Sequence, residues 1–209
     1  MIRPPYPVQC AIQLLHEISP LSPPLAAYLS AFFESKEYQP GEYLLRNGET
    51  CCNLLFIARG LVQVSCEPSP APEIQGKGIG NCFLMDGDTA IPESFFSQAP
   101  ADEYMRALEH TTVAAISAEA LEEVYASFPE FNYYARRLTE NYYVKTIRQS
   151  KALRYRRAAD SYSYLEKQYP SLVSRVPAKY LAGYLGVDET YVHALYAKRK
   201  SPPVTETVS

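Results

Sequence analysis

The chain has 209 residues, of which 47% are hydrophobic and 21% are charged, and its formal net charge is −3. A chain of this size can bury one large core or two smaller ones. No stretch approaches the run of about 18 apolar residues that a membrane span needs, and prolines and polar residues interrupt residues 1–19, which disfavours a secretory signal. We therefore expect a cytoplasmic protein without a membrane partner.

The two parts of the chain differ in charge. Residues 1–130 contain 6 Lys and Arg against 17 Asp and Glu, a net charge of −11, whereas residues 131–209 contain 14 against 6, a net charge of +8. An acidic front part joined to a basic back part indicates that only the back part binds a polyanion. A solvated helix face would give the same count, so charge alone leaves both interpretations open.

Short strands are predicted in the front part. Seven of the nine glycines fall between Gly41 and Gly87, and turn residues there separate strand-like runs. In the run Leu61–Cys66, apolar and polar residues alternate, which predicts a half-buried strand, and residues 68–80 are predicted to form a loop. Many short strands with turns between them favour an antiparallel β-roll or jelly roll. The predicted strand segments are Glu42–Leu45, Leu54–Ala58, Leu61–Cys66, Asn81–Met85 and Tyr104–Ile116.

A long helix is predicted after the strands. Residues 130–169 contain neither Gly nor Pro, and apolar residues recur there at steps of three and four, the spacing of one helical face. A helix of about 25 residues would be about 38 Å long, more than one small domain needs. We therefore predict a central helix over residues 131–155 that pairs with a second copy of the chain. The alternative is that the stripe packs on the chain's own barrel. The stripe consists of Phe131, Ala135, Leu138 and Tyr142.

The segment Ala178–Lys198, AKYLAGYLGVDETYVHALYAK, has the pattern of a helix-turn-helix. Two helices that cross steeply over a tight turn need a small residue at their contact and a glycine where the backbone turns left-handed. Ala182 meets the first requirement, Gly186 meets the second, and Asp188 suits the N-cap of the second helix. A helical hairpin without a DNA-binding function would satisfy the same packing rules. Apolar residues for the helix contact stand at Leu181, Leu185, Val187, Val192 and Leu195.

The surroundings of this segment favour DNA as its partner. Basic residues suited to phosphate contacts flank the two predicted helices, and Arg154, Arg156 and Arg157 precede them. The first residues of the second helix would face base edges if that helix entered a major groove. The predicted DNA-binding residues are Lys179, Glu189, Thr190, Tyr191, His193, Ala194, Lys198, Arg199 and Lys200.

Three segments carry a resemblance to a known family: PGEYLLRNGETCCNLLFIARGLVQV, ALEHTTVAAISAEALEEVYASFPEF and RVPAKYLAGYLGVDETYV. With the order of acidic β-domain, long helix and helix-turn-helix, the chain resembles the cyclic-AMP receptor/fumarate-nitrate regulator superfamily over nearly its whole length. The resemblance implies an α+β chain in which residues 1–130 form a cyclic-nucleotide-binding-like β-roll sensor domain. Residues 131–155 would be the central dimerisation helix, and residues 156–209 the helix-turn-helix DNA-binding domain.

The resemblance also implies an effector site in Ile91–Met105, IPESFFSQAPADEYM. Nucleotide-binding relatives grip the ribose and cyclic phosphate with a Gly-Glu pair, a short helical turn and an Arg-Ser pair. Here Glu93 matches the ribose-binding Glu, but Pro92 replaces the Gly. Ala101 and Asp102 occupy the Arg-Ser positions, so we expect cyclic AMP to bind weakly or not at all. The candidate effector-binding residues are Glu93, Ser94, Asp102, Arg106 and Thr146, the last matching a helix threonine that touches adenine in some relatives.

The residue types that bind metals and cofactors occur without the spacing that such sites need. The cysteine count is odd and includes no C-x-x-C pair, which disfavours a disulfide framework, a zinc site and an iron-sulfur cluster. The histidines are isolated, so we expect neither haem ligation nor a metal site. No nucleophile and base stand together, and we expect a protein that is not an enzyme and holds no cofactor. These residues are Cys10, Cys51, Cys52, Cys66, Cys82, His16, His110 and His193.

These observations favour a dimeric DNA-binding transcription regulator whose DNA binding is modulated by a small-molecule effector in the β-roll. The alternative is an effector-binding or scaffold protein of the same fold that has lost sequence-specific DNA binding. That alternative is favoured by Thr190 and Ala194, which stand where relatives commonly carry the Glu and Arg that read base edges. A third hypothesis, the regulatory part of a kinase or channel, requires a catalytic or pore segment that these residues do not contain.

Overall fold

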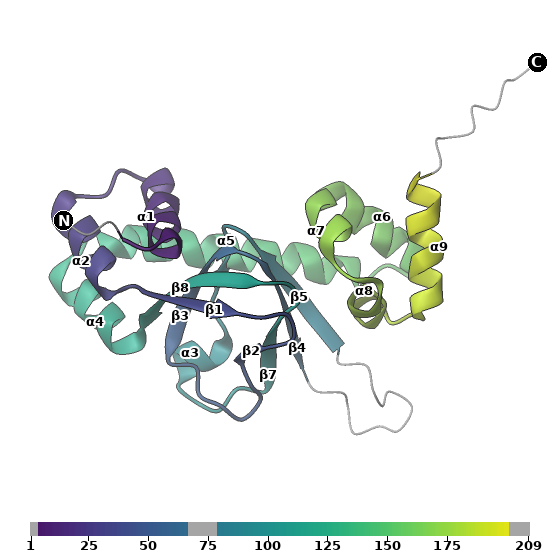
Figure 1. Cartoon of the computed structure of the whole chain (residues 1–209), viewed down its shortest axis with the longest axis horizontal. Coiled ribbons are helices and arrows are strands. Elements are labelled where there is room, and N and C mark those ends of the chain that lie inside the picture. Colours follow the sequence, from purple (N-terminus) through teal and green to yellow (C-terminus); the bar gives the residue numbers. More distant parts are fainter. Residues whose placement is uncertain (1–3, 67–78, 201–209) are drawn as a thin grey trace, which may run out of the picture.

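The computed structural model describes residues 4–66 and 79–200, and the side chains of residues 79–81 and 198–200 lie outside that description. A β-rich part and a helical part lie at opposite ends of the long axis, and helix α5 (Phe131–Ala152) runs from one to the other (Figure 1). Antiparallel sheets and helices together make an α+β fold, as the sequence predicts. Within the described residues, no helix combines the length and the apolar character of a membrane span.

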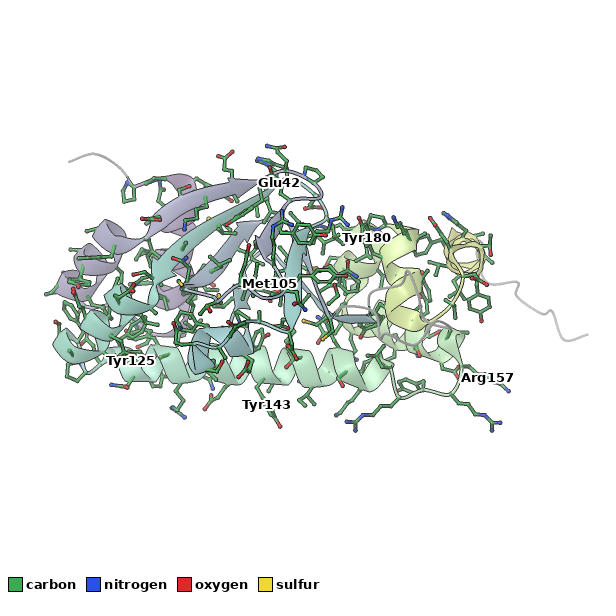
Figure 2. All side chains as sticks on the ribbon, turned by 90° about the horizontal axis from the view of Figure 1, so that it is seen from below. Glu42, Met105, Tyr125, Tyr143, Arg157 and Tyr180 are labelled. Carbon is green, nitrogen blue, oxygen red and sulfur yellow. The ribbon has the colours of Figure 1, made fainter. Side chains whose placement is uncertain are left out.

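Two four-stranded antiparallel sheets form the β-rich part. One sheet has the order β1-β8-β3-β6 and the other the order β2-β7-β4-β5. Apolar side chains from both sheets, including Ile57, Met105 and Ile116, are buried in one core, and Figure 2 shows Met105 inside this part of the molecule. The strands are β1 (Glu34–Tyr38), β2 (Tyr43–Leu45), β3 (Asn53–Arg59), β4 (Leu61–Cys66), β5 (Ile79–Met85), β6 (Thr89–Ala90), β7 (Glu103–Ala107) and β8 (Thr111–Ser117).

Each predicted strand segment contains a strand, but Tyr104–Ile116 contains two, because the chain bends at residues 108–110 between β7 and β8. The sequence analysis missed β1 and β6. Strand β1 (ESKEY) is mostly charged and shows no apolar alternation, and β6 has only two residues. The loop predicted over residues 68–80 lies outside the described residues except for its last two, which belong to β5.

Two further helices that the sequence analysis did not predict cover the first sheet. Helix α1 (Tyr6–Ile18) packs on β3 and β8, and α2 (Pro23–Phe32) packs beside it. Both helices have proline in the first turn, where the missing N–H would be unpaired in any case. The Ser22 hydroxyl caps α2 by accepting a hydrogen bond from the Leu25 N–H at 3.4 Å. Prolines that interrupt an apolar run can therefore mark the starts of helices.

Helix α5 places its predicted dimer stripe against the β-rich part of the same chain. Phe131 is 3% exposed and Leu138 is 6% exposed, and both belong to the core of that part. Ala135 and Tyr142 pack against the same core. The dimer interface predicted at these four residues stays a prediction, and two of them, Phe131 and Leu138, are already buried within their own protomer. The opposite face of α5 is exposed, and Figure 2 shows Tyr143 pointing away from the barrel.

Four helices form the C-terminal part: α6 (Ala158–Gln168), α7 (Pro170–Arg175), α8 (Ala178–Leu185) and α9 (Glu189–Lys200). A break over residues 153–157 separates α6 from α5, although this window contains neither Gly nor Pro. Apolar side chains from these helices, including Leu165, Leu172 and Leu181, make a second core.

The second core also contains Leu61 of β4 and Phe83 of β5, which ties the C-terminal part to the outer face of the second sheet. The Phe83 ring lies 5.4 Å from the ring of Tyr184 in α8, measured between centroids. The prediction of a half-buried strand over Leu61–Cys66 is wrong, because helices cover the outer face where Leu61 stands, and Gln63 and Ser65 are buried as well.

Polar contacts hold the same junction. The buried Gln149 of α5 accepts a hydrogen bond from the Phe83 N–H at 2.7 Å and donates one to the Phe83 carbonyl at 2.8 Å. The Tyr184 hydroxyl donates to the Gln149 carbonyl at 2.6 Å. At the rim, Arg175 of α7 pairs with Asp86 and Glu109 of the β-rich part, each at 2.5 Å. The sheet, α5 and the C-terminal helices are thus joined by both packing and satisfied polar groups.

Candidate DNA-binding surface and effector cavity

The turn between α8 and α9 has the geometry that its residues predict. Gly186 caps α8 in the left-handed region with φ of +67°, a conformation that side chains with a Cβ rarely adopt. The N–H of Val187 donates to the Ala182 carbonyl at 3.0 Å, and Ala182 is buried where the helices approach each other. The Asp188 carbonyl accepts from the N–H of Tyr191 at 3.0 Å, which starts α9. A tight, fixed turn therefore joins the two helices.

Helix α9 has one buried face and one exposed face. Val192 and Leu195 pack with Leu181 of α8 in the second core. The ring nitrogen Nε2 of His193 lies 3.6 Å from a carboxylate oxygen of Glu189, one turn earlier on the exposed side. The exposed face consists of Glu189, Thr190, Tyr191, His193, Ala194 and Ala197. Five of these six are predicted base-reading residues, and none of the five is used in packing.

Exposed basic residues occur elsewhere in and beside the C-terminal part. Lys179, at the start of α8, is exposed and lies 5.9 Å from the centroid of the Tyr180 ring. The segment of residues 153–157 carries three exposed arginines, and Figure 2 shows Arg157 extending away from the body of the molecule. The backbone of Lys198, Arg199 and Lys200 continues α9, but their side chains lie outside the described residues.

The residues predicted to bind an effector are not brought together in one site. Glu93 and Asp102 are exposed, whereas Ser94 is buried. The Ser94 hydroxyl accepts from the Cys51 N–H at 3.0 Å and donates to the Ala99 carbonyl at 2.5 Å, so the protein itself occupies its hydrogen-bonding capacity. The Thr146 hydroxyl bonds to carbonyls of its own helix.

Arg106 cannot replace the missing phosphate-binding arginine. Its neighbour Met105 enters the barrel core, and alternation along β7 puts Arg106 on the outer face. There its Nε donates to the Gly41 carbonyl at 3.1 Å, and its guanidinium lies 5.5 Å from the Tyr43 ring centroid. Ala101 is buried, and its N–H and carbonyl are both paired with the neighbouring backbone. The barrel therefore offers an anionic phosphate no guanidinium at this position.

A cavity that the sequence analysis missed lies beside the barrel, between α3 (Glu93–Ser97), α4 (Ala118–Ser127) and the first half of α5. Its volume is about 510 Å³. Leu54 of β3 also lines it, so four chain segments contribute its walls and no local sequence pattern could have predicted it. Phe95, Phe96, Tyr125, Phe131 and Leu138 supply most of the apolar lining.

Several ionisable groups of the barrel and of α5 are either held in their neutral form or paired within the protein. Burial raises the pKa of the Cys82 thiol to about 12, so this thiol stays neutral and unreactive. Lys145 of α5 forms an ion pair with Asp88 next to β6. Cys10, Cys51, Cys52 and Cys82 form no disulfide, and the described residues contain no cluster of three metal-ligating side chains. Burial, and to a lesser extent the nearby Cys82 and Glu103, raises the pKa of Tyr142, which keeps its hydroxyl protonated.

Known proteins are similar to part of this structure. Residues 35–128 match the protein family described as cyclic nucleotide-binding domain. The matched segment runs from β1 to the end of α4 and contributes three of the four wall segments of the cavity, while α5 and the C-terminal helices follow it. No curated protein matches the chain.

Solved structures resemble the cyclic nucleotide-binding domain and the helices after it together. FixK2 from Bradyrhizobium japonicum aligns with a TM-score of 0.65 at 14% identity, over 79% of this chain and 83% of its own. The c-di-GMP-responsive global regulator CLP of Xanthomonas campestris aligns with a TM-score of 0.62 at 15% identity, over 86% of this chain and 92% of its own. A CooA mutant from Carboxydothermus hydrogenoformans aligns with a TM-score of 0.60 at 15% identity, over 81% of this chain and 77% of its own. The solved structures thereby confirm the fold that the resemblance predicted, and at these identities they establish the fold alone.

Proposed function

We propose that the protein is a DNA-binding transcription regulator that acts as a homodimer and inserts α9 into the major groove. The α8–α9 pair carries this proposal. Packing uses Val192 and Leu195, whereas the predicted base-reading residues Glu189, Thr190, Tyr191, His193 and Ala194 are exposed to solvent. The net charge of +8 over residues 131–209 supports a polyanionic partner.

The proposed dimer uses the outward face of α5. Tyr143 is 63% exposed, and Val144 and Ile147 beside it are exposed as well. An apolar patch of this kind on a long surface helix is suited to pairing with a copy of itself. A parallel pair about a two-fold axis would present two α9 helices on one side of a duplex, about 34 Å apart, and would favour an inverted repeat.

The roles within α9 are proposed to differ. Thr190, Tyr191 and His193 would read base edges, and the basic residues around α9 would contact phosphates. Since the exposed face offers no Arg, Asn or Gln among its described side chains, strong bidentate contacts are absent. We expect modest discrimination, with each mismatch costing towards the lower end of about 1–3 kcal/mol.

The test begins with selection of duplexes from random DNA, followed by affinity measurements at several salt concentrations. Lys198→Ala should weaken binding to all duplexes alike and reduce the salt slope by roughly one. His193→Ala should change the selected sequence, whereas His110→Ala, which alters an exposed histidine of the β-rich part, should leave it unchanged. Unselective binding by the wild type would favour a protein of this fold that has lost sequence-specific recognition. Absence of salt-sensitive binding at low ionic strength would overturn the proposal.

A further inference from the structure

The cavity between α3, α4 and α5 has the size and the lining of a small-molecule site. Its volume of about 510 Å³ falls within the range of about 300–1,000 Å³ typical of ligand pockets. Four aromatic residues line it, and one of them, Phe96, is 66% exposed at its rim. A large aromatic ring held in water on a five-residue helix costs free energy that a bound apolar molecule would recover.

The charge of the cavity determines what it can hold. Glu119 and Glu122 of α4 belong to its lining and are exposed, and the lining contains no Lys, Arg or His among the described residues. Burial, and to a lesser extent the nearby Glu122, raises the pKa of Tyr125. Carboxylates at the rim repel an anion and attract an organic cation, and aromatic faces add a cation–π attraction. A nucleotide or another phosphate ester is therefore disfavoured here.

We propose that this cavity is the effector site of the protein and binds an aromatic amine or a comparable organic cation, with neutral aromatic molecules binding more weakly. The lining takes residues from the segment Ile91–Met105 but includes neither Glu93 nor the Ala101 and Asp102 that stand at the phosphate-binding positions of relatives. Its wall includes Ala135, Leu138 and Thr139 of α5, the helix that continues through Gln149 to the C-terminal part. A ligand would thus contact the cyclic nucleotide-binding domain and α5 at once. Regulation of DNA binding by this ligand rests on the proposed DNA-binding function, but the binding of the ligand itself does not.

Three probes of the same shape and different charge test the site without DNA. Calorimetry or ligand-detected NMR on the full chain would compare 1-naphthylmethylamine, 1-naphthylmethanol and 1-naphthoate. The amine should bind about tenfold more tightly than the naphthoate, with the alcohol between them. In the double variant Glu119→Gln, Glu122→Gln, the three affinities should converge towards that of the alcohol. Equal affinity of the amine and the naphthoate in the wild type would overturn the proposal.

Filling the cavity tests its location. Ala135→Leu adds bulk to the cavity wall and should weaken binding of all three probes by about tenfold or more. The control Ala126→Leu adds the same bulk at an exposed position of α4 and should leave the affinities unchanged. Phe96→Ala removes an exposed ring and is expected to fold even if Ala135→Leu does not. If Phe96→Ala and a folded Ala135→Leu both bind the amine as the wild type does, the cavity is not the site.

Discussion

Both faces of helix α5 carry apolar residues, yet these residues have different surroundings. The inward face, with Phe131, Leu138 and Gln149, is buried against the chain's own sheets. The outward face, with Tyr143 and Ile147, has no partner among the described residues of the protomer. Helical periodicity predicts that a stripe is buried but does not identify what buries it. The inward face stabilises the protomer, and the outward face is available for assembly.

The largest expected effect comes from charging the inward face. Leu138→Asp would bury an unpaired carboxylate and leave a void, which should lower the free energy of unfolding by about 4 kcal/mol or more. Thermal and urea unfolding followed by circular dichroism would measure this loss. The same change on the outward face, Ile147→Asp, is the matched control. Similar losses for the two variants would contradict the distinction between the faces.

A smaller loss is expected at the junction with the C-terminal part. Gln149→Leu would leave the N–H and the carbonyl of Phe83 without their partner, at a cost of about 2–4 kcal/mol. Amide hydrogen exchange at Phe83 should accelerate, and urea unfolding should show the lost stability. Gln13→Leu, which removes an exposed side chain-to-side chain bond on α1, should leave both measurements unchanged.

The rim of this junction should contribute about 1 kcal/mol or less, because its carboxylates are well exposed to solvent. Burial alone would raise the pKa of Asp86, but hydrogen bonds from Arg175 and from the Gly60 N–H outweigh it and lower the pKa below its ordinary value of 3.8. The stabilisation is therefore present above pH 3.8 and is lost as the pH falls through the lower value of the folded state.

Arg175→Gln should reduce this acid-dependent loss of stability, as measured by urea unfolding at several pH values. Arg136→Gln, which breaks an exposed pair with Glu140 on α5, is the control and should keep the wild-type pH dependence. An unchanged pH profile in Arg175→Gln would show that the rim contacts do not stabilise the junction.

The smallest effect on protomer stability is expected for Ile147→Asp, within about 0.5 kcal/mol, because surface substitutions away from packed features usually fall in this range. Its effect on assembly should be the largest, since a buried pair of carboxylates would disrupt the proposed dimer. Sedimentation velocity should give monomers for Ile147→Asp and dimers for Asn141→Asp, which adds the same charge at an exposed position off the apolar patch. Dimers in both variants would exclude this interface.

Sequence reasoning succeeded where a local steric requirement fixes the residue. Gly186 and Ala182 predicted the α8–α9 turn because a left-handed φ strongly favours glycine and the close approach favours a small residue. The strands of the barrel followed from turn residues and apolar runs. Strand β1 could not be predicted, because its charged sequence forms a strand only through pairing with β8.

The candidate sites were harder to predict because they depend on register and on distant segments. Whether Arg106 faces into or out of the barrel is decided by the strand register, which a shift of one residue reverses. The cavity joins Phe95, Tyr125 and Leu138 from three helices, and their proximity follows only from the folded arrangement. The exposed face of α9 was predictable, since it is what remains of a short amphipathic helix after its packing residues are assigned.

Sedimentation of the protein with a selected duplex tests the central claim most directly, since it reports assembly and DNA binding together. The proposed function predicts two wild-type protomers for each inverted repeat, dissociating as salt is raised, and a folded Ile147→Asp protein that no longer forms this complex. One wild-type protomer for each duplex, or no complex at low salt, would contradict the claim that α5 pairs two α9 helices on DNA.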